Sequence, residues 1–536
     1  MNRHRFYRFT SRTAAVIVAA AGLAASAPAF AQTSTPRITL AQVAQTGQSV
    51  PATPGDAARP TLGLSMDQAV AMAFETNLVL RSQQLNPASA AQDLASARAA
   101  YAMTVGSTLS RGTTNSPPSD FTQGSSVFTS NSLATSTRIQ QLLPFYGANY
   151  QVTWSGSRSE ASGIQTFNPS LNSSLNVSVD QPLLRNFKTD SARNAVTTAT
   201  TLEQVTDLTL KEQMVQLEET VRLAYLQLVG ALQQRDVART ILDVSETQLK
   251  NDQKRVDVGA LPRVEIVGDE ASVASNEEGV IIADAAIASA EDNLRALILD
   301  PARADYWTVR LDPTDPIQLA PRQVDVDQAI HTALGNRADL QAARKSLGVN
   351  DLSITLLRNQ RLPQLDFTLN YTAVGKGGTQ FTFGSGFPPA VLNQTTRSFG
   401  TALGDSFSNA FPSWTYGLSF SYPIGQHAIE ASLAKARVQK TQAELTLKND
   451  ELQVAVAVRQ AARNIDTALK RVHATQTAQA NQELLLDAAQ KKFDVGLATN
   501  FEVLQDQQNT ANARVAALNA ILAYNQALII FDLIQK

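Results

Sequence analysis

Two long segments without proline constrain the fold of this chain more than any other feature of its sequence. The segments Asp190–Val256 and Gln426–Asp494 contain 67 and 69 residues, and neither holds the residue that most strongly breaks helices. At about 1.5 Å per residue, each would form a helix of roughly 100 Å. A helix of that length cannot be buried inside one globule, so we expect each to lie along neighbouring helices.

Apolar residues in and after these segments recur at steps of three and four. The pattern runs through Val221, Tyr225, Leu228 and Leu232, through Val454, Val458, Ala461, Ile465, Leu469 and Val472, and through Phe501, Leu504, Gln508, Ala511, Val515, Leu518 and Leu522. This spacing predicts the packing seams of coiled coils. A soluble helical scaffold would carry the same seams, so they indicate no function by themselves.

Three motifs occur twice in the same order, which indicates a duplicated unit. Asp67–Val70 recurs as Asp327–Ile330, Ser178–Pro182 as Ser419–Pro423, and Lys254–Gly259 as Lys491–Gly496. In each unit we expect a short helix, a second helix (Leu80–Met103 or Ala338–Arg361), strands, and two long helices joined by a tight turn. Ser65-x-x-Gln68 and Asp325-x-x-Gln328 resemble capping boxes at the two openings.

These elements divide the chain into two predicted repeats. The first covers residues 62–300, with strands at about 104–182 and long helices at about 190–299. The second covers residues 324–536, with strands at about 364–423 and long helices at about 426–533. Residues 301–323 form the linker between the repeats.

The predicted strands alternate apolar side chains with small polar ones. Apolar positions are Tyr150, Val152 and Trp154; Leu175, Val177 and Val179; Leu365, Phe367, Leu369, Tyr371 and Ala373; and Tyr416, Leu418, Phe420 and Tyr422. Such alternation over about 9–11 residues is typical of a transmembrane barrel strand, with lipid on one side and water on the other. A half-exposed soluble sheet would show the same pattern.

The N-terminus favours the barrel because it reads as an export signal. Residues 1–31 combine four arginines, the apolar run Ala14–Ala25 and the cleavage motif Ala29-Phe30-Ala31, which is typical of a signal peptide. A retained anchor helix is the alternative, but the run is too short to span a bilayer. Residues 32–61 are predicted to be a disordered lead. We expect no later membrane-spanning helix, since no stretch reaches about 18 apolar residues.

Composition excludes several classes of function. The chain has no cysteine, so disulfides, thiolate metal sites, thiol catalysis and a lipid on an N-terminal cysteine are ruled out. Lys and Arg number 45 against 47 Asp and Glu, which gives no basic excess for nucleic acid. His331, His427 and His473 lie far apart and outside any ligand motif, so we expect no metal and no cofactor. The glycines at 375–378 and 384–386 are interpreted as an extracellular loop.

The strand count requires more than one chain. Four strands are convincing, and six result if Thr104–Arg111 and Ser136–Leu142 also insert. Because outer-membrane barrels close with at least about eight strands, one chain cannot close alone. Three chains would give 12 or 18 strands.

The ordered motifs resemble the TolC family of outer-membrane efflux proteins over nearly all of residues 62–536. The resemblance rests on Leu64–Val70, Gln181–Arg185, Tyr524–Leu528 and the two turns Arg255–Pro262 and Phe493–Leu504. It implies a mixed fold, an α-helical coiled-coil tunnel joined to a transmembrane β-barrel in a homotrimer. It also implies a passive exit duct in the outer membrane that extends into the periplasm. Its partners would be a periplasmic adaptor and an inner-membrane pump of the RND or ABC type.

The resemblance also points to particular residues. The turns Val258-Gly259-Ala260-Leu261 and Val495-Gly496-Leu497-Ala498 match the tips that meet the adaptor in the family, although Ala260 stands where leucine is usual. The simpler interpretation is that each glycine only permits the positive φ that ends a helix.

Two acidic residues match the family's pore constriction. Glu265 and Glu502 each follow a tip glycine by six residues, and three copies of each would favour cations in a narrow pore. Two departures are evident, since Gln505 replaces a second carboxylate and Ala498 replaces an arginine. Glu502 could instead serve only the capping box Thr499-x-x-Glu502, and Glu265 could serve only the helix dipole.

Two other classes of function stay open at this stage. One is an exported coiled-coil scaffold or adaptor without a pore. The other is a secreted enzyme, which would need a cluster of titratable residues that the sequence does not show. We therefore expect no enzyme.

Overall fold

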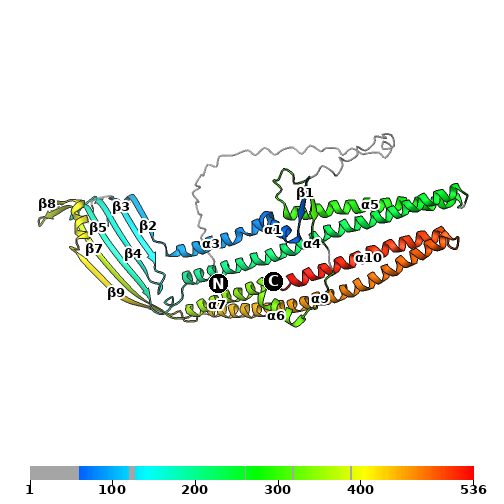
Figure 1. Ribbon diagram of the computed structural model, residues 1–536. Helices are drawn as coiled ribbons and strands as arrows, with labels where there is room; N and C mark the ends of the chain where they lie inside the picture. Colours follow the sequence, from blue (N-terminus) through cyan, green and yellow to red (C-terminus); the bar gives the residue numbers. More distant parts are fainter. Residues whose placement is uncertain are drawn as a thin grey trace, which may run out of the picture. The chain divides into compact units, whose positions relative to one another are not determined.

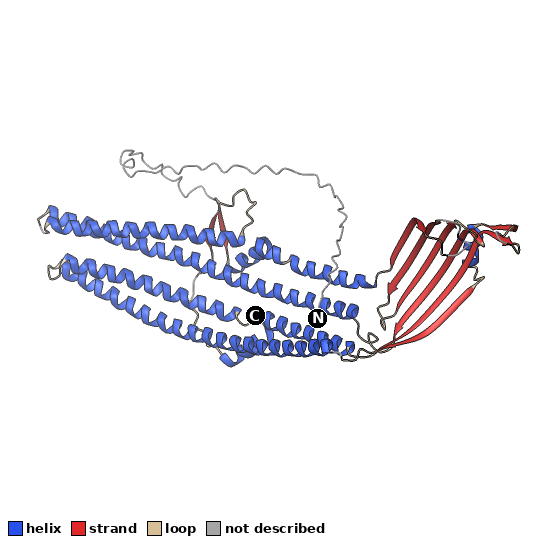
Figure 2. Ribbon diagram, turned by 180° about the vertical axis from the view of Figure 1, so that it is seen from behind, coloured by secondary structure: helices blue, strands red, loops and turns tan. Residues whose placement is uncertain are grey.

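The computed structural model describes residues 60–119, 123, 127–259, 261–316, 319–386, 389–425 and 427–536. The predicted signal peptide and nearly all of the predicted lead lie outside these residues. Residues from Arg59 onward form one unit in which long helices run side by side and a sheet lies beyond one end of them (Figure 1). Figure 2 shows the helical part in blue and the sheet in red.

Two helical hairpins supply the length of the molecule. Helix α4 (Ser191–Asp257) returns through α5 (Arg263–Ile298), and α9 (His427–Asp494) returns through α10 (Asn500–Leu533). Helices α4 and α9 have 67 and 68 residues, each beginning one residue after its predicted start. Asp190 begins α4 because its carboxylate accepts a hydrogen bond from the Arg193 N–H at 2.7 Å.

Shorter helices lie along both hairpins. They are α1 (Met66–Thr76), α2 (Leu78–Gln83), α3 (Leu85–Arg98), the single turn η2 (Ala99–Tyr101), α6 (Val326–Asn336) and α7 (Ala338–Gln360). The second helix of the first repeat was predicted as continuous from Leu80, but it is interrupted at Gln84. Ser65 forms the complete capping box with Gln68, whereas Asp325 caps α6 through its own carboxylate alone.

A small parallel sheet joins the start of the chain to the linker. Strand β1 (Thr61–Leu64) pairs with β6 (Arg310–Pro313), so Thr61 belongs to a strand and not to the predicted lead, and the linker contributes a strand. The Tyr225 hydroxyl of α4 donates to the Leu64 carbonyl at 2.9 Å and accepts from the Asp315 N–H at 3.2 Å. These bonds fix the small sheet to α4.

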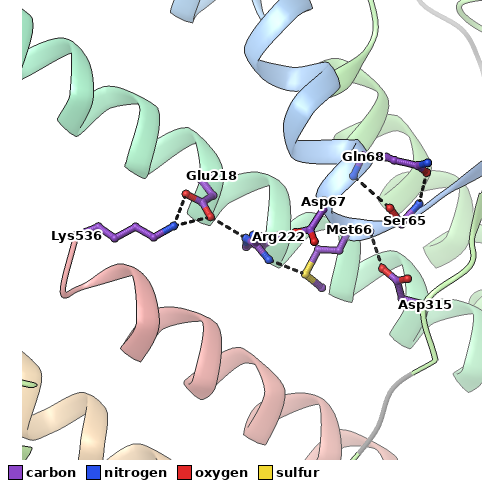
Figure 3. A network of polar contacts seen from close by, with 8 residues as sticks. All are labelled: Ser65, Met66, Asp67, Gln68, Glu218, Arg222, Asp315 and Lys536. Carbon is purple, nitrogen blue, oxygen red and sulfur yellow. Dashed lines mark hydrogen bonds and ion pairs between the residues drawn. The ribbon is translucent and has the colours of Figure 1, made fainter.

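A polar network beside this sheet ties α1, α4 and the C-terminus together (Figure 3). The guanidinium of Arg222 pairs with Asp67 at 3.0 Å and with Glu218 at 3.1 Å, while the Lys536 ammonium pairs with Glu218 at 2.9 Å. Glu218 is buried, and the two cations compensate its charge. The chain's last residue is thereby held against the first long helix.

The predicted seams are correct on α4 and α9 and displaced on α10. Val221, Tyr225 and Leu228 are fully buried in one cluster, and Val454, Val458, Ala461, Ile465 and Val472 are buried in a second. On α10 a different stripe is buried, and it includes Val503, Thr510, Ala517, Tyr524 and Phe531, each seven residues after the one before. Of the predicted α10 stripe only Ala511 is buried. Leu504 and Leu522 of that stripe instead face Gly268 of α5 and Gly230 of α4.

Six long strands form one antiparallel sheet. They are β2 (Thr104–Ser116), β3 (Phe128–Leu142), β4 (Asn149–Ala161), β5 (Phe167–Pro182), β7 (Gln364–Phe383) and β9 (Pro412–Ser421), in that spatial order. The larger strand count is therefore the correct one. A short strand β8 (Val391–Arg397) pairs with the far end of β7, and helix α8 (Phe399–Phe407) lies between β8 and β9 in the sequence.

The glycine-rich segment at 375–378 was predicted as a loop and belongs to β7. Its residues keep the ladder with β5, with Gly375 opposite Ser173 and Gly378 opposite Ser170. Because the backbone groups are paired there, β7 continues to Phe383, and the loop begins only at Gly384.

Candidate functional site

The register of the sheet separates two faces of opposite character. Val152, Val177, Tyr371 and Trp414 lie opposite one another across four strands, and Thr153, Asn176, Thr372 and Ser413 lie in the next row. Successive side chains of a strand point to opposite faces. The first face is therefore apolar and aromatic, and the second is rich in Ser, Thr and Asn.

The apolar face is exposed where a soluble sheet would cover it. On β9, Trp414, Tyr416, Leu418 and Phe420 are each about two-thirds exposed. These residues share the face of Val177 and Tyr371, and none of the long helices covers them (Figure 2). An exposed apolar surface of this kind marks contact with lipid or with another protein.

The two outer strands leave their backbone groups free. Within the described residues β2 pairs only with β3, and β9 pairs only with β7. Every pairing in the series is antiparallel, so six strands place β2 and β9 in opposite directions. The β9 edge of one chain can thus continue the ladder onto the β2 edge of another, which removes the free edges.

The second hairpin turn presents apolar side chains to solvent. Gly496 has φ +75°, and a Cβ there would have no neighbour within 4 Å. The Leu497 N–H donates to the Lys492 carbonyl at 2.8 Å, which closes the helix end. Val495 and Leu497 are 70% and 78% exposed, so this tip offers apolar surface, while Ala498 is half-buried.

The first hairpin turn has the same form. Gly259 has φ +77° and donates to the Val256 carbonyl at 2.9 Å, and Val258 is 79% exposed. Leu261 is half-buried, and Ala260 lies outside the described residues. Both turns lie at the end of the helices away from the sheet (Figure 1). Both glycines adopt the positive φ that ends a helix, as the simpler interpretation requires. The exposed Val258, Val495 and Leu497 also provide apolar surface for a partner.

The two predicted acidic residues stand in the first turns of the returning helices. Glu265 is half-buried near the start of α5, and Glu502 is exposed near the start of α10. The Thr499 hydroxyl accepts from the Glu502 N–H at 3.3 Å, but the reciprocal bond of a capping box is absent within the described residues. The Glu502 carboxylate is therefore free of the capping contact predicted for it.

Polar contacts that sequence reasoning missed join the two tips. Arg255 of α4 pairs with Asp494 of α9 at 2.6 Å and lies 4.8 Å from the Phe493 ring centroid. The Asn500 amide of α10 donates to the Asp269 carboxylate of α5 at 2.8 Å, and both side chains are buried. These contacts connect residues more than 230 positions apart, so no local pattern could have indicated them.

A buried acid pair lies beside this connection. Asp252 of α4 and Asp269 of α5 are 0% and 1% exposed, and one carboxylate oxygen of each has no hydrogen-bond partner among the residues that the structure describes. Burial, and then the nearby Asp252 carboxyl group, raise the pKa of Asp269 to about 6, although the Asn500 hydrogen bond opposes the shift. Arg255, 3.9 Å from Asp252, is the nearby cation.

One described helix meets a membrane-span criterion. By length and composition α10 is apolar enough to cross a bilayer, which differs from the expectation of no such segment. Tyr524 and Phe531 of α10 are buried with α9 residues, and Leu522 contacts α4. We therefore assign α10 to the helical hairpin. Among the described residues no group of three His, Cys, Asp or Glu side chains could hold a metal ion.

Comparison with known proteins finds similarity to outer-membrane efflux and export proteins. Residues 329–531 match the family model described as outer membrane efflux protein. The pyoverdine export outer membrane protein OpmQ of Pseudomonas aeruginosa is 21% identical over 305 residues, which is 57% of this chain. The match spans 58% of that relative's length.

Solved structures extend the likeness to most of the chain. The CmeC outer membrane channel of Campylobacter jejuni matches with a TM-score of 0.62 at 15% identity and covers 88% of this chain and 85% of its own. The open state of the MtrE outer membrane channel of Neisseria gonorrhoeae matches with a TM-score of 0.59 at 16% identity and covers 88% of each chain. The predicted fold, long coiled-coil helices joined to a β-domain, is thus confirmed.

Proposed function

We propose that this chain, whose residues 329–531 match the outer membrane efflux protein family model, is the outer-membrane channel of a tripartite export system. One observation carries the proposal: a sheet with an apolar and a polar face is attached to helices of 67 and 68 residues. Lipid would meet the apolar face and water the polar face. Helices of roughly 100 Å would carry the duct into the periplasm.

The free strand edges support closure between chains. Six strands fall short of the minimum of about eight for an outer-membrane barrel, so several copies must contribute. Three copies, the number that the resemblance implies, give 3 × 6 = 18 strands. Each β9 edge would pair with the β2 edge of the next copy. Of the two barrels predicted from the sequence, with 12 and 18 strands, this is the wider one.

The exposed tips support docking onto a periplasmic adaptor. We place this contact at Val258, Gly259, Ala260 and Leu261 and at Val495, Gly496, Leu497 and Ala498. The adaptor would connect the channel to an inner-membrane pump of the RND or ABC type, the latter as in type I secretion. The pump supplies the energy, and cargo diffuses through a water-filled duct without chemical change.

Glu265 and Glu502 are proposed to line the constriction near these tips. Both stand in the first turn of a returning helix, next to the exposed turns. Three chains would bring six carboxylates near one axis, where they would attract cations and repel anions. The solvent-facing position of Glu502 supports this role more strongly than that of Glu265.

Cell fractionation tests the proposal against the scaffold alternative. The chain should sediment with the outer membrane in a density gradient and need detergent for release. An exported scaffold would appear in the soluble periplasmic fraction, and that result would refute the channel. Deleting the gene should also raise the intracellular level of the exported compounds, and re-expression should reverse the effect.

A further inference from the structure

The short helix α8 packs on one face of the sheet and does not cover the end of the sheet. A Cβ on Gly375 would stand 1.8 Å from the Ala402 carbonyl oxygen, and one on Gly377 would stand 2.9 Å from the Ser398 carbonyl. The hydroxyls of Ser173 and Ser406 are 2.8 Å apart. Larger side chains in place of Gly375, Gly377 and Ser173 would displace α8. We call the surface that these small residues form the seat of α8; it lies at the end of the sheet away from the long helices (Figure 2).

The register shows which face of the sheet carries this seat. Gly375 lies opposite Ser173, which lies opposite Gly156 on β4, and a Cβ on Gly156 would stand 3.0 Å from the Phe399 ring. Two residues along each strand come Ala373, Leu175 and Trp154, which belong to the apolar face. Helix α8 therefore packs on the apolar face, the one assigned to lipid.

The outer surface of α8 continues that apolar face. Ala402 and Ser406 are buried against the seat, whereas Phe407 and the following Phe411 are 61% and 56% exposed. The single charged residue of the helix, Asp405, is paired with Arg397 at 2.7 Å. The helix thus presents aromatic rings and no unpaired charge, as the neighbouring surface of β9 does.

The position along the strands corresponds to the edge of a bilayer. Apolar positions on β7 run from Leu365 to Ala373, about 27 Å at 3.3–3.4 Å per residue. A tilt of roughly 40° reduces this to about 20 Å of depth, close to the apolar band of about 25 Å in outer-membrane barrels. Gly375 and Gly377 then lie at the outer interface, where aromatic residues gather.

We infer that α8 is an interfacial helix on the outside of the barrel, with Phe407 and Phe411 in contact with outer-leaflet lipid. This inference rests on the proposed function, because the apolar face must be the lipid face. Helix α8 then anchors the barrel at the outer interface. It does not fold inward across the mouth of the pore.

Single-cysteine labelling tests the inference cleanly because the chain has no cysteine of its own. Phe407→Cys, Leu418→Cys and Ser419→Cys would each carry an environment-sensitive fluorophore in the full channel, reconstituted in nanodiscs with or without nitroxide-labelled lipid. Leu418 reports the apolar face and Ser419 the polar face. All three positions lie at exposed sites, where the substitution leaves packing intact.

We expect lipid nitroxide to quench the label at 407 as strongly as at 418, with shallow nitroxides the more effective at 407. Iodide in the water should quench the label at 419 instead. Iodide quenching at 407 without lipid quenching would overturn the inference, as would protection from both quenchers, which would indicate cover by another copy. Loss of lipid quenching at 418 would instead refute the barrel itself, so the two failures are distinguishable.

Discussion

At the scale of single residues, Asp269 is the group whose protonation should matter most. Its raised pKa means that the folded protein keeps a proton that the unfolded chain loses. Between the ordinary value of 3.8 and about 6, the free energy of unfolding of the tip should therefore fall as pH rises. Below this window the full stabilisation is present, and above it no further change follows. Asp252, Glu265 and Arg255 are the charged groups near it.

The variant Asp269→Asn should remove this pH dependence. The amide stays neutral at every pH, so the variant should be more stable than the original tip at pH 7 by on the order of 2 kcal/mol. Hydrogen exchange of tip peptides, expressed as free energies of opening at pH 4.5 and 7, measures it. Glu270→Gln, an exposed neighbour on α5, is the matched control. An unchanged pH slope in Asp269→Asn would show that another group is responsible.

Glu265 and Glu502 should control ion selectivity. Changing both to Gln should weaken the cation preference in planar-bilayer recordings and reduce block by divalent cations, because six charges leave the constriction. Thr499→Ala is the control, since it removes the helix cap at a cost of about 1 kcal/mol and keeps the charge. Equal permeability ratios before and after the double change would remove both residues from the pore.

At the scale of the elements, the tips should carry partner binding without contributing to assembly. Leu497→Glu replaces an exposed apolar side chain of the tip with a charged one, so export should be lost while the multimer still forms. Leu484→Glu is the control, since Leu484 is similarly exposed on the shaft of α9. Intracellular accumulation of the exported compounds measures export, and native gel mobility measures assembly. Full export in Leu497→Glu would place the adaptor contact elsewhere.

Sequence periodicity predicted the long helices well because their signal is local and repeated. It placed the α10 seam on the wrong stripe because α10 has apolar or small residues on two sides. One side, with Tyr524, packs on α9, and the other, with Leu522, packs on α4. A helix with two partners has no single apolar stripe, so spacing alone could not select between them.

Strand patterns predicted the apolar face correctly but made several strands too short, β3 at its start and β2 and β7 at their ends. The first half of β3, Phe128–Thr135, contains four hydroxyl residues and one asparagine, and β7 runs through Gly375–Gly378. Pairing with neighbours, and not side-chain pattern, keeps these residues extended. The Asp252–Asp269–Asn500 cluster had no signal at all, since each residue is an ordinary polar side chain until the hairpins meet.

At the scale of the whole molecule, three features of the described residues suit a duct made by several chains. Both edges of the sheet need a partner, an aromatic face lacks cover, and two tips expose apolar residues far from the sheet. A single soluble chain would leave all three uncompensated. Assembly around one axis in a membrane would compensate the first two, and an adaptor would compensate the third.

Native mass measurement of the chain extracted from outer membranes in mild detergent tests this account most directly. We predict a complex of three copies that persists after detergent exchange, since the β2 and β9 edges of neighbouring copies would complete one closed ladder. A two-copy complex would contradict the trimer and leave a 12-stranded barrel. A single copy that is soluble without detergent would contradict the channel altogether.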